Sequence, residues 1–405
     1  GGPVAPYIQS QRRDTYGKYA KLLVELGHAY YCFCEKTESE EDSGEFNREA
    51  DPCRSLTPEE IEANLAAGKP YVIRQRIPEE GTTTFHDVSF GDITVECSTL
   101  DDQVLIKRDG LPTYNFANVV DDHLMGITHV VRGSEYLSSA PKYNLLYEAF
   151  GWNIPTYVHC SPVMRDAQHK MSKRHGDPSY EDLIAQGFLT EAVLNYVALL
   201  GWSPKGELSE KEFFDLNELV AAFDISGISK SPAVFDIVKL KWMNAEYIKK
   251  LSPECFFQKA EPWLKQAVKS PEIDLKAVAA LVQSRCEVLS DLPERVDFLD
   301  ALPEYSTELY VHKKSKTNTE NSLTALKAVL PVLEQLETWT NEALYERLTE
   351  LAGEMEVKNS IILWPLRVAV SGKASTPGGA TELCALLGKE ESLARIKTGI
   401  AKLES

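Results

Sequence analysis

Apolar residues in the first part of the chain recur first with the period of a helix and then with the period of a strand. From Asp14 onward they gather on one helical face, and Gly27 supplies a stop signal. This pattern predicts an amphipathic helix that packs through Tyr16, Tyr19, Ala20, Leu23 and Leu26. Residues 71–77 and 84–96 instead alternate apolar with polar residues and are rich in Val, Ile and Phe, which predicts a small antiparallel layer of strands.

The middle and the end of the chain show two further patterns. Residues 103–133 mix short apolar runs with turn residues, and residues 138–152 have a helical pattern that stops at Gly151. Such alternation of strands with a helix indicates an α/β layer. After about Ser252 Gly-rich turns become rare and helical periodicity dominates, which predicts an all-α C-terminal third.

Composition restricts the class of protein. The chain has 405 residues, enough for two to four domains, and no stretch approaches the roughly 20 apolar residues that a membrane span needs. Its start at Gly1 shows no signal-peptide pattern, and its eight cysteines are spread over most of the chain rather than forming a disulfide framework. We therefore expect a cytoplasmic protein without contact to a membrane.

The charge of the chain bears on nucleic-acid binding. A formal net charge of -18 argues against a polyanionic partner unless basic residues gather locally, since RNA binding depends on neutralising phosphates. Residues 239–250 and 312–316 offer such local clusters, although either cluster alone is as well explained as a solvated face.

The sequence HKMSKRHG at 169–176 is the clearest candidate for chemistry. It follows a strand-like stretch and is basic, so Lys170 and Lys173 could stabilise the charge that builds up on phosphates as pyrophosphate leaves ATP. KMSKR resembles the second ATP signature of class I aminoacyl-tRNA synthetases, KMSKS in its general form. The resemblance implies catalytic roles for Lys170, Ser172, Lys173 and Arg174, with Lys173 also binding ATP.

A longer match identifies the chain as similar to one family of that class. Residues 110–152 closely resemble the block that bacterial glutamyl-tRNA synthetases place in the second half of the nucleotide-binding domain. LLGWSP at 199–204 and FDIVKLKWMN at 235–244 match the same family in the expected order, so the resemblance covers nearly the whole chain. It implies attachment of L-glutamate to tRNA(Glu) through glutamyl-adenylate, with ATP and Mg²⁺ as substrate, in a protein expected to be a monomer.

The resemblance assigns the substrate residues. Tyr114, Asn118 and Arg132 fall where the family holds glutamate, and an arginine fork can pair with a carboxylate in a way that the neutral amide of glutamine cannot match. The ATP positions are Glu135, Tyr136, His159, Val163 and Met164. This chain has RGSEYL where the family generally shows RGEEWL, so Tyr136 replaces a tryptophan and keeps an aromatic face for the adenine.

Two clusters contain residue types that bind metals. We interpret Asp121-Asp122-His123 as structural, because the resemblance assigns it no ligand role. Cys32, Cys34 and Cys53 resemble the zinc-binding cysteines of some bacterial members, but those members have CRH where this chain has Cys53-Arg54-Ser55. Since zinc usually takes four N or S ligands, we predict no bound metal, and the three cysteines stay weak candidates for zinc.

In the helical part, Arg285 and Arg367 match arginines that the family presents to anticodon bases. An arginine at the position of Arg285 is associated with strict reading of the third anticodon base. We therefore hypothesise an enzyme that charges only tRNA(Glu).

The resemblance predicts the architecture: a multidomain α/β plus all-α chain, with an incomplete class I Rossmann-like catalytic domain. The expected segments are the remainder of the first catalytic half (1–29), an α+β acceptor-binding insertion (30–105), the second catalytic half (106–165), a stem-contact region with the KMSKR loop (166–250) and two helical anticodon-binding domains (251–305 and 306–405). The family's N-terminal HIGH motif is not in this sequence, so we expect the chain to be truncated and inactive alone.

Two alternative functions remain open at this point. A glutamine-tRNA ligase shares the catalytic plan, but enzymes of that kind read the anticodon with β-barrels, whereas this chain ends in predicted helices. A non-catalytic tRNA-binding protein derived from a synthetase would explain the missing HIGH motif, yet such a module has no need of the ATP loop that contains Lys173.

Overall fold

The computed structural model describes residues 2–34 and 51–405. The chain forms two compact units that interleave along the sequence. Unit 1 comprises Gly1–Lys170, Leu199–Lys211 and Ala221–Phe235, and unit 2 comprises Met171–Ala198, Glu212–Val220 and Asp236–Ser405. No helix among the described residues is both long and apolar enough to span a membrane.

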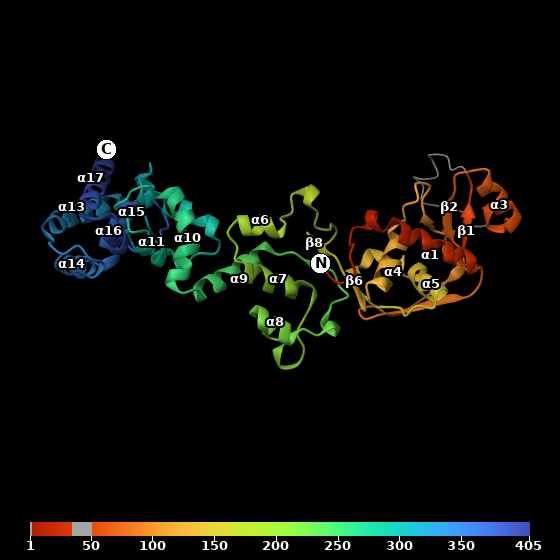
Figure 1. The fold of residues 1–405 in the computed structure, drawn as a ribbon. Coiled ribbons are helices and arrows are strands. Elements are labelled where there is room, and N and C mark those ends of the chain that lie inside the picture. Colours follow the sequence, from red (N-terminus) through yellow and green to blue (C-terminus); the bar gives the residue numbers. More distant parts are fainter. Residues whose placement is uncertain (1, 35–50) are drawn as a thin grey trace. The chain divides into compact units, whose positions relative to one another are not determined.

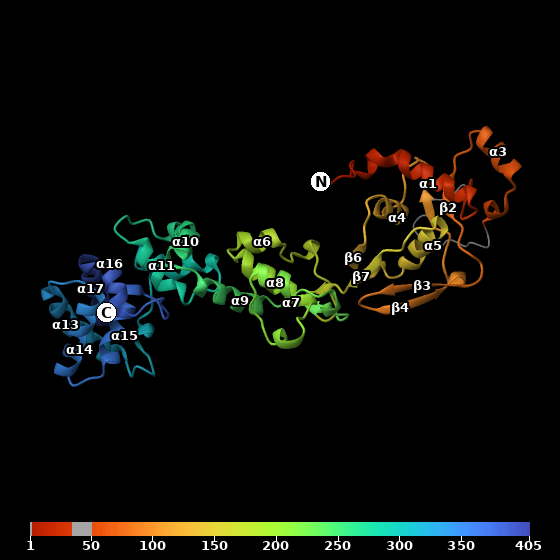
Figure 2. The same cartoon turned by 60° about the horizontal axis from the view of Figure 1, so that its bottom comes forward.

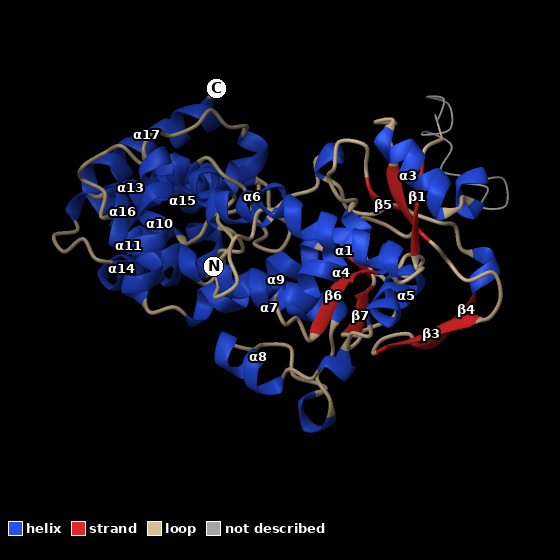
Figure 3. Ribbon diagram, turned by 45° about the vertical axis from the view of Figure 1, so that its right-hand side comes forward, coloured by secondary structure: helices blue, strands red, loops and turns tan. Residues whose placement is uncertain are grey.

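Unit 1 contains the named strands, drawn in red in Figure 3. One sheet has the order β1-β2-β5, from Ala29–Cys32, Val72–Gln75 and Val104–Ile106, and its pairs are antiparallel. A second sheet has the order β4-β3-β7-β6. Its strands are β3 (Thr82–Asp87), β4 (Gly91–Glu96), β6 (His129–Gly133) and β7 (Thr156–Cys160).

The second sheet is mixed. β3 and β4 form the long antiparallel hairpin seen in Figure 2, while β7 pairs in parallel with both β3 and β6. The predicted antiparallel layer of residues 71–77 and 84–96 is therefore wrong as a single layer. β2 belongs to the first sheet and the hairpin to the second, because each segment finds its partners far away in the sequence.

Within residues 2–34 and 51–170, the α-helices that accompany these sheets are α1 (Arg13–Glu25), α3 (Pro58–Ala66), α4 (Tyr114–Leu124) and α5 (Ala140–Phe150). The predicted first helix is confirmed, with its buried positions at Tyr16, Ala20 and Leu23, whereas Leu26 is half exposed just beyond its end. One apolar core unites α1, α4 and α5 with both sheets. Its largest members include Tyr16, Leu23, Phe85, Leu105, Phe116, Leu146 and Tyr157.

Two short strands close unit 1. β8 (Val163–Met164) pairs in parallel with β9 (Ala233–Val234), and the Phe235 backbone N–H donates to the Met164 carbonyl over 2.8 Å. This pairing joins parts of the chain that are about 70 residues apart in sequence. Two segments of the chain between them, Met171–Ala198 and Glu212–Val220, belong to unit 2.

Unit 2 has only helices among the named elements of its described residues (Figure 1). Helices α6 to α9 are Tyr180–Ala185, Thr190–Gly201, Leu216–Ala222 and Ile237–Lys250, with the last residues of α7 and α8 in unit 1. Helices α10 to α17 follow as Pro253–Ala267, Leu275–Gln283, Leu292–Val296, Thr319–Gln335, Asn341–Glu354, Asn359–Ser371, Ala380–Leu387 and Lys389–Glu404. The all-α C-terminal third is confirmed.

A single apolar core runs through unit 2 from Leu189 to Ile396. Residues of both predicted helical domains, 251–305 and 306–405, contribute to it. The buried side chain of Asn244 on α9 ties neighbouring segments together, since its Oδ1 accepts from the Leu189 N–H over 2.8 Å and its Nδ2 donates to the Glu287 carbonyl over 2.6 Å. The six segment boundaries predicted from the sequence stay predictions.

Candidate active site

Arg132 occupies the centre of the candidate substrate site in unit 1. It lies on β6, and three tyrosine rings surround its guanidinium, whose Cζ is 4.6 Å from the Tyr143 ring centroid, 5.0 Å from Tyr136 and 5.9 Å from Tyr157. Its buried Nε has no hydrogen-bond partner among the described residues. A positive charge held between aromatic faces and left with a free donor is suited to an anionic ligand.

Helix α4 brings two further predicted residues to this region. Tyr114, its first residue, is 54% exposed, and its ring centroid is 5.6 Å from that of Tyr136. One turn later, the buried Nδ2 of Asn118 also lacks a hydrogen-bond partner within the part of the chain that the structure describes. Asn115, between them, accepts a 2.5 Å hydrogen bond from the Tyr143 hydroxyl and so fixes α4 against α5.

The conformation at the end of β6 sets the position of Glu135. This exposed residue directly follows Ser134 in the short helix Ser134–Tyr136. The Glu135 carboxylate lies against the Cα of Gly133, where a Cβ would overlap it, but this is the end of a flexible, exposed side chain that can rotate away.

His159 lies next to Arg132 in the sheet, because these two residues are partners in the β6–β7 register. The imidazole is fully buried, and its Nδ1 is 2.7 Å from Oδ2 of Asp87, the last residue of β3. The same Oδ2 accepts from the His159 backbone N–H over 3.0 Å. The Nε2 atom of His159 is buried and has no hydrogen-bond partner among the described residues. The sequence analysis missed Asp87, which positions this histidine.

Asp122 on α4 is a titratable group close enough to Arg132 to feel its charge. Burial raises the pKa of Asp122 to about 6, and the positive charge of Arg132 opposes this shift. Its neighbours make contacts within the fold: Asp121 accepts hydrogen bonds from Arg12 and Tyr16 over 2.8 and 2.6 Å, and the His123 ring stacks on Trp152 with centroids 3.7 Å apart.

The segment around the KMSKR sequence divides between the two units. In unit 1, Val163 and Met164 form β8, and Lys170 forms an isolated bridge with Met164. In unit 2, Ser172 caps the short helix Lys173–His175 by accepting from the Arg174 N–H, and its own N–H donates to Asp177 over 2.7 Å. Lys170, Lys173 and Arg174 are exposed.

Arg285 and Arg367 lie in the helical unit near two cavities. Arg285 donates to the Thr376 carbonyl over 2.9 Å and lines a cavity of about 410 Å³ together with Arg295 and Lys373. Arg367 lines a cavity of about 510 Å³. Burial and the positive charge of Arg285 lower the pKa of Arg367, so the two guanidinium groups repel each other.

The second cavity also contains an aromatic platform. The Arg367 Cζ is 4.2 Å from the Trp364 ring centroid, and His312 stacks on that ring with centroids 3.6 Å apart. Arg367 Nε is buried without a hydrogen-bond partner among the described residues. His312 and Arg367 both lie against the Trp364 indole, so this ring holds the arginine beside the cavity. The sequence analysis named Arg367 and missed Trp364, although LWPLR at 363–367 contains both residues.

Comparison with known proteins gives a consistent result over the whole chain. Residues 3–242 match the family model described as tRNA synthetases class I (E and Q), catalytic domain, and residues 255–400 match an anticodon binding domain. A glutamate–tRNA ligase from Clostridium kluyveri is 57% identical over the full chain, which covers 83% of that relative. The corresponding ligase from Clostridium tetani is 55% identical with the same coverage.

This chain belongs to the glutamate–tRNA ligase family. A solved glutamate–tRNA ligase from Elizabethkingia meningosepticum, in complex with its amino acid, matches with a TM-score of 0.87 and 32% identity and covers 100% of this chain and 85% of that one. The glutamate-tRNA synthetase from Elizabethkingia anophelis matches with a TM-score of 0.86 at 30% identity, over 99% of this chain and 85% of that one. The predicted family and fold class are confirmed, and glutamine–tRNA ligase is not favoured.

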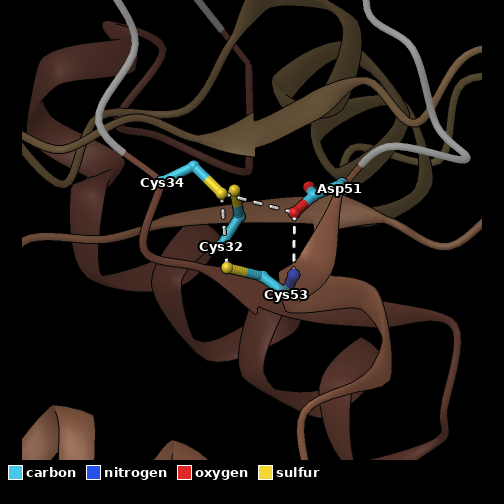
Figure 4. A group of neighbouring side chains, drawn as sticks. All are labelled: Cys32, Cys34, Asp51 and Cys53. Carbon is cyan, nitrogen blue, oxygen red and sulfur yellow. Dashed lines mark hydrogen bonds between the residues drawn. The ribbon is translucent and has the colours of Figure 1, made fainter.

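The three cysteines that the sequence offers as weak zinc candidates form a cluster in unit 1 of this chain (Figure 4). Cys32 and Cys34 lie at the end of β1, and Cys53 lies in the short helix η3 (Pro52–Ser55). Their three sulfur atoms and one carboxylate oxygen of Asp51 all lie within 4.8 Å of one another. Burial raises the pKa of both Cys32 and Cys34, so these thiols are protonated when no metal is bound. The donor set fits a tetrahedral zinc ion.

Asp51 is the residue that sequence reasoning missed at this cluster. The prediction of no metal rested on Ser55, which stands where other members have histidine, and that prediction remains untested. Ser55 donates to the Pro52 carbonyl over 3.3 Å instead of joining the thiols. The only signal in the sequence was an acidic residue two positions before a cysteine, which is too common a pattern to identify a ligand.

Proposed function

We propose that this chain is the greater part of an enzyme that attaches glutamate to tRNA(Glu) in two steps, as the family membership suggests, and that the reaction also needs the segment with the HIGH motif. A carboxylate oxygen of glutamate attacks the α-phosphorus of ATP, the bond to the β-phosphate oxygen breaks, and pyrophosphate leaves. A hydroxyl of the terminal adenosine of the tRNA then attacks the acyl carbon of glutamyl-adenylate, and AMP leaves. Mg²⁺ accompanies ATP and supplies charge neutralisation to its phosphates. The reaction belongs to the cytoplasm, and we propose a monomer.

The single observation that supports glutamate as the substrate is the free donor capacity of Arg132. Its guanidinium is enclosed by three tyrosine rings, and its buried Nε has no partner among the described residues. Leaving such a donor unsatisfied costs about 1 to 3 kcal/mol, and a ligand carboxylate removes this cost through charge-assisted hydrogen bonds. Glutamine would bring an amide, which lacks the negative charge. Tyr114 and Asn118 complete the proposed glutamate site.

ATP contacts are proposed for Glu135 and Tyr136, which follow Arg132 in the chain, and for His159, its partner in the sheet. The family resemblance adds Val163, Met164 and Lys173. The half-buried ring of Tyr136 is the proposed stacking face for adenine, Glu135 precedes it in the chain, and the Nε2 atom of His159 has no partner among the described residues. Val163 and Met164 on β8 supply apolar contact. The exposed basic groups of Lys170, Lys173 and Arg174, with Ser172, would stabilise pyrophosphate as negative charge develops on it.

The helical unit is the proposed reader of the tRNA anticodon. Trp364 holds the Arg367 guanidinium beside one cavity, and Arg285 lines a second cavity with two further basic residues. These local positive charges offset a chain whose overall charge of -18 disfavours RNA. We propose that Arg285 confers the preference for tRNA(Glu) over tRNA(Gln).

The test is glutamate-dependent exchange of pyrophosphate into ATP in the presence of tRNA(Glu). We would assay this chain and a version extended by its upstream coding sequence, each as wild type, Arg132→Gln and Arg13→Gln. Arg132→Gln should lower kcat/KM for glutamate about 10- to 200-fold, which corresponds to losing about 1.5 to 3 kcal/mol of charged hydrogen bonding. Arg13 is an exposed arginine of α1, and its variant should match wild type.

Two results would contradict the proposal. Equal loss in the Arg132 and Arg13 variants would mean that the effect is general charge and not a substrate contact. Absence of exchange in both lengths of the wild-type protein, with tRNA still bound, would favour a non-catalytic tRNA-binding protein.

A further inference from the structure

We infer that Asp51 is the fourth ligand of a zinc ion held by Cys32, Cys34 and Cys53, so that this chain uses a carboxylate where a histidine is lacking. Figure 4 shows the three thiols and the Asp51 carboxylate pointing toward one another. This group alone, among the described residues, brings three or more potential ligand atoms together. The inference is independent of the proposed catalytic function.

The distances match the edges of a zinc tetrahedron. With Zn–S bonds near 2.3 Å, two sulfur ligands of one zinc ion are about 3.8 Å apart, and a sulfur and an oxygen ligand are about 3.6 Å apart. Cys34 Sγ is 3.5 Å from Cys53 Sγ and 3.5 Å from Asp51 Oδ1. These two distances are close to the edges of a zinc tetrahedron, and the remaining ligand atoms lie within 4.8 Å of one another.

Neighbouring groups hold the carboxylate in this orientation. The Cys53 backbone N–H donates to Asp51 Oδ1 over 2.9 Å, while Oδ2 accepts from the Tyr30 hydroxyl over 3.0 Å and is 3.8 Å from Arg74 Nε. Metal ligands commonly have such outer partners, which orient them and tune their basicity. Because the far side of the carboxylate is occupied, its Oδ1 is directed at the sulfur atoms.

Charge at the cluster also favours a cation. Three thiolates and one carboxylate carry four negative charges, which a divalent ion reduces to two. Arg74 beside Asp51 offsets part of the remainder, and Lys107 and Arg108 line the adjoining cavity of about 560 Å³ with Cys32 and Cys34. Sulfur ligands select zinc over the harder magnesium and calcium ions.

Two other roles are open to these residues, and each gives a distinct result. Asp51 caps the helix η3 through the Cys53 N–H, and a cap needs no metal. Cys34 and Cys53 could also be oxidised to a disulfide, because their sulfur atoms are neighbours. A cap function survives in Asp51→Asn, since asparagine keeps an acceptor oxygen, whereas zinc binding should weaken when the anionic ligand is lost.

The experiment measures metal content and affinity in purified protein washed with chelator and then given zinc. Wild type should retain about one equivalent of zinc. Asp51→Asn should weaken zinc binding more than about 100-fold in competition with a chromophoric chelator, because even outer partners of a metal cost about 10- to 100-fold. The matched control is Asp109→Asn, an acidic residue of the same cavity whose side chain accepts from the Leu111 N–H; its zinc affinity should equal that of wild type.

Cobalt substitution keeps the inference testable if Asp51→Asn folds poorly. Wild type with Co²⁺ should show thiolate-to-cobalt charge transfer and the intense ligand-field bands of a tetrahedral ion, and Asp51→Cys should strengthen the charge-transfer band by adding a fourth thiolate. Zinc affinity and cobalt spectra unchanged by both substitutions would exclude Asp51 as a ligand. Wild type that takes up no zinc, or that contains a Cys34–Cys53 disulfide under reducing purification, would overturn the site.

Discussion

Replacing Asp87 with asparagine should destabilise unit 1 at the junction of β3 and β7, next to His159 of the candidate site. Asp87 is fully buried and accepts four hydrogen bonds. Its Oδ1 accepts from the N–H groups of Ser89 and Phe90 over 2.9 and 2.8 Å, and its Oδ2 accepts from the backbone N–H and the Nδ1 of His159 over 3.0 and 2.7 Å. One carboxylate thus joins the end of β3 to β7.

The magnitude follows from the donors that asparagine cannot serve. Asparagine keeps one acceptor oxygen and replaces the other with an NH₂ group, which cannot accept a hydrogen bond. The NH₂ group must therefore face either the two His159 donors or the N–H groups of Ser89 and Phe90, and those donors lose their partner. A buried donor without a partner costs about 1 to 3 kcal/mol, and hydrogen bonds to a carboxylate are roughly twice as strong as neutral ones. Removing the buried charge recovers part of this loss. We therefore expect a destabilisation of about 2 to 4 kcal/mol.

Hydrogen exchange followed by mass spectrometry measures this free energy segment by segment. Peptides from β3 and β7 should exchange faster in Asp87→Asn, while the helices of unit 2 serve as an internal reference. The control is Asp92→Asn, which removes an exposed ion pair with His86 in the same hairpin and should change stability by no more than about 0.5 kcal/mol. If both variants change exchange equally, the buried carboxylate does not join the strands and the reasoning fails.

Two further predictions concern pH and the anticodon. Burial raises the pKa of Asp122 to about 6 in the folded protein, whereas the unfolded chain has a pKa of about 3.9 at this residue. Between these pH values the folded protein binds a proton that the unfolded chain has released. The free energy of unfolding should therefore fall as pH rises from about 4 to about 6. Asp122→Asn should remove that contribution, and an identical difference in Tm from wild type at pH 4.5 and pH 7 would contradict it. Arg285→Gln should cost about 1 to 3 kcal/mol of base discrimination, measured as the ratio of kcat/KM for tRNA(Glu) and tRNA(Gln); an unchanged ratio would exclude this role.

The periodicity of apolar residues predicted helices and their buried faces, because both depend on residues that are close in the sequence. Helix α1 buries Tyr16, Ala20 and Leu23 as expected, because a helix repeats every 3.6 residues and presents one face to the core. The pairing of strands depends on partners far away in the sequence, so alternation in residues 71–77 and 84–96 could identify strands without revealing that they join different sheets.

The candidate site divides in the same manner. Arg132 and Tyr136 were found through a resemblance that covers one continuous block of sequence, and the structure adds that their side chains are in contact. Asp87 was missed because it comes from a distant strand, and only the parallel pairing of β3 with β7 brings it to His159. Asp51 was missed because its proximity to Cys34 depends on the chain returning to β1.

The late pairing of β8 with β9 has a consequence for synthesis on the ribosome. Val163 and Met164 emerge well before Ala233 and Val234, and at usual elongation rates the interval is on the order of ten seconds. During that time unit 1 lacks one of its strands, while the chain passes through segments that belong to unit 2. Nascent chains stalled before residue 233 should therefore be more sensitive to protease near β8 than chains stalled after unit 1 is complete.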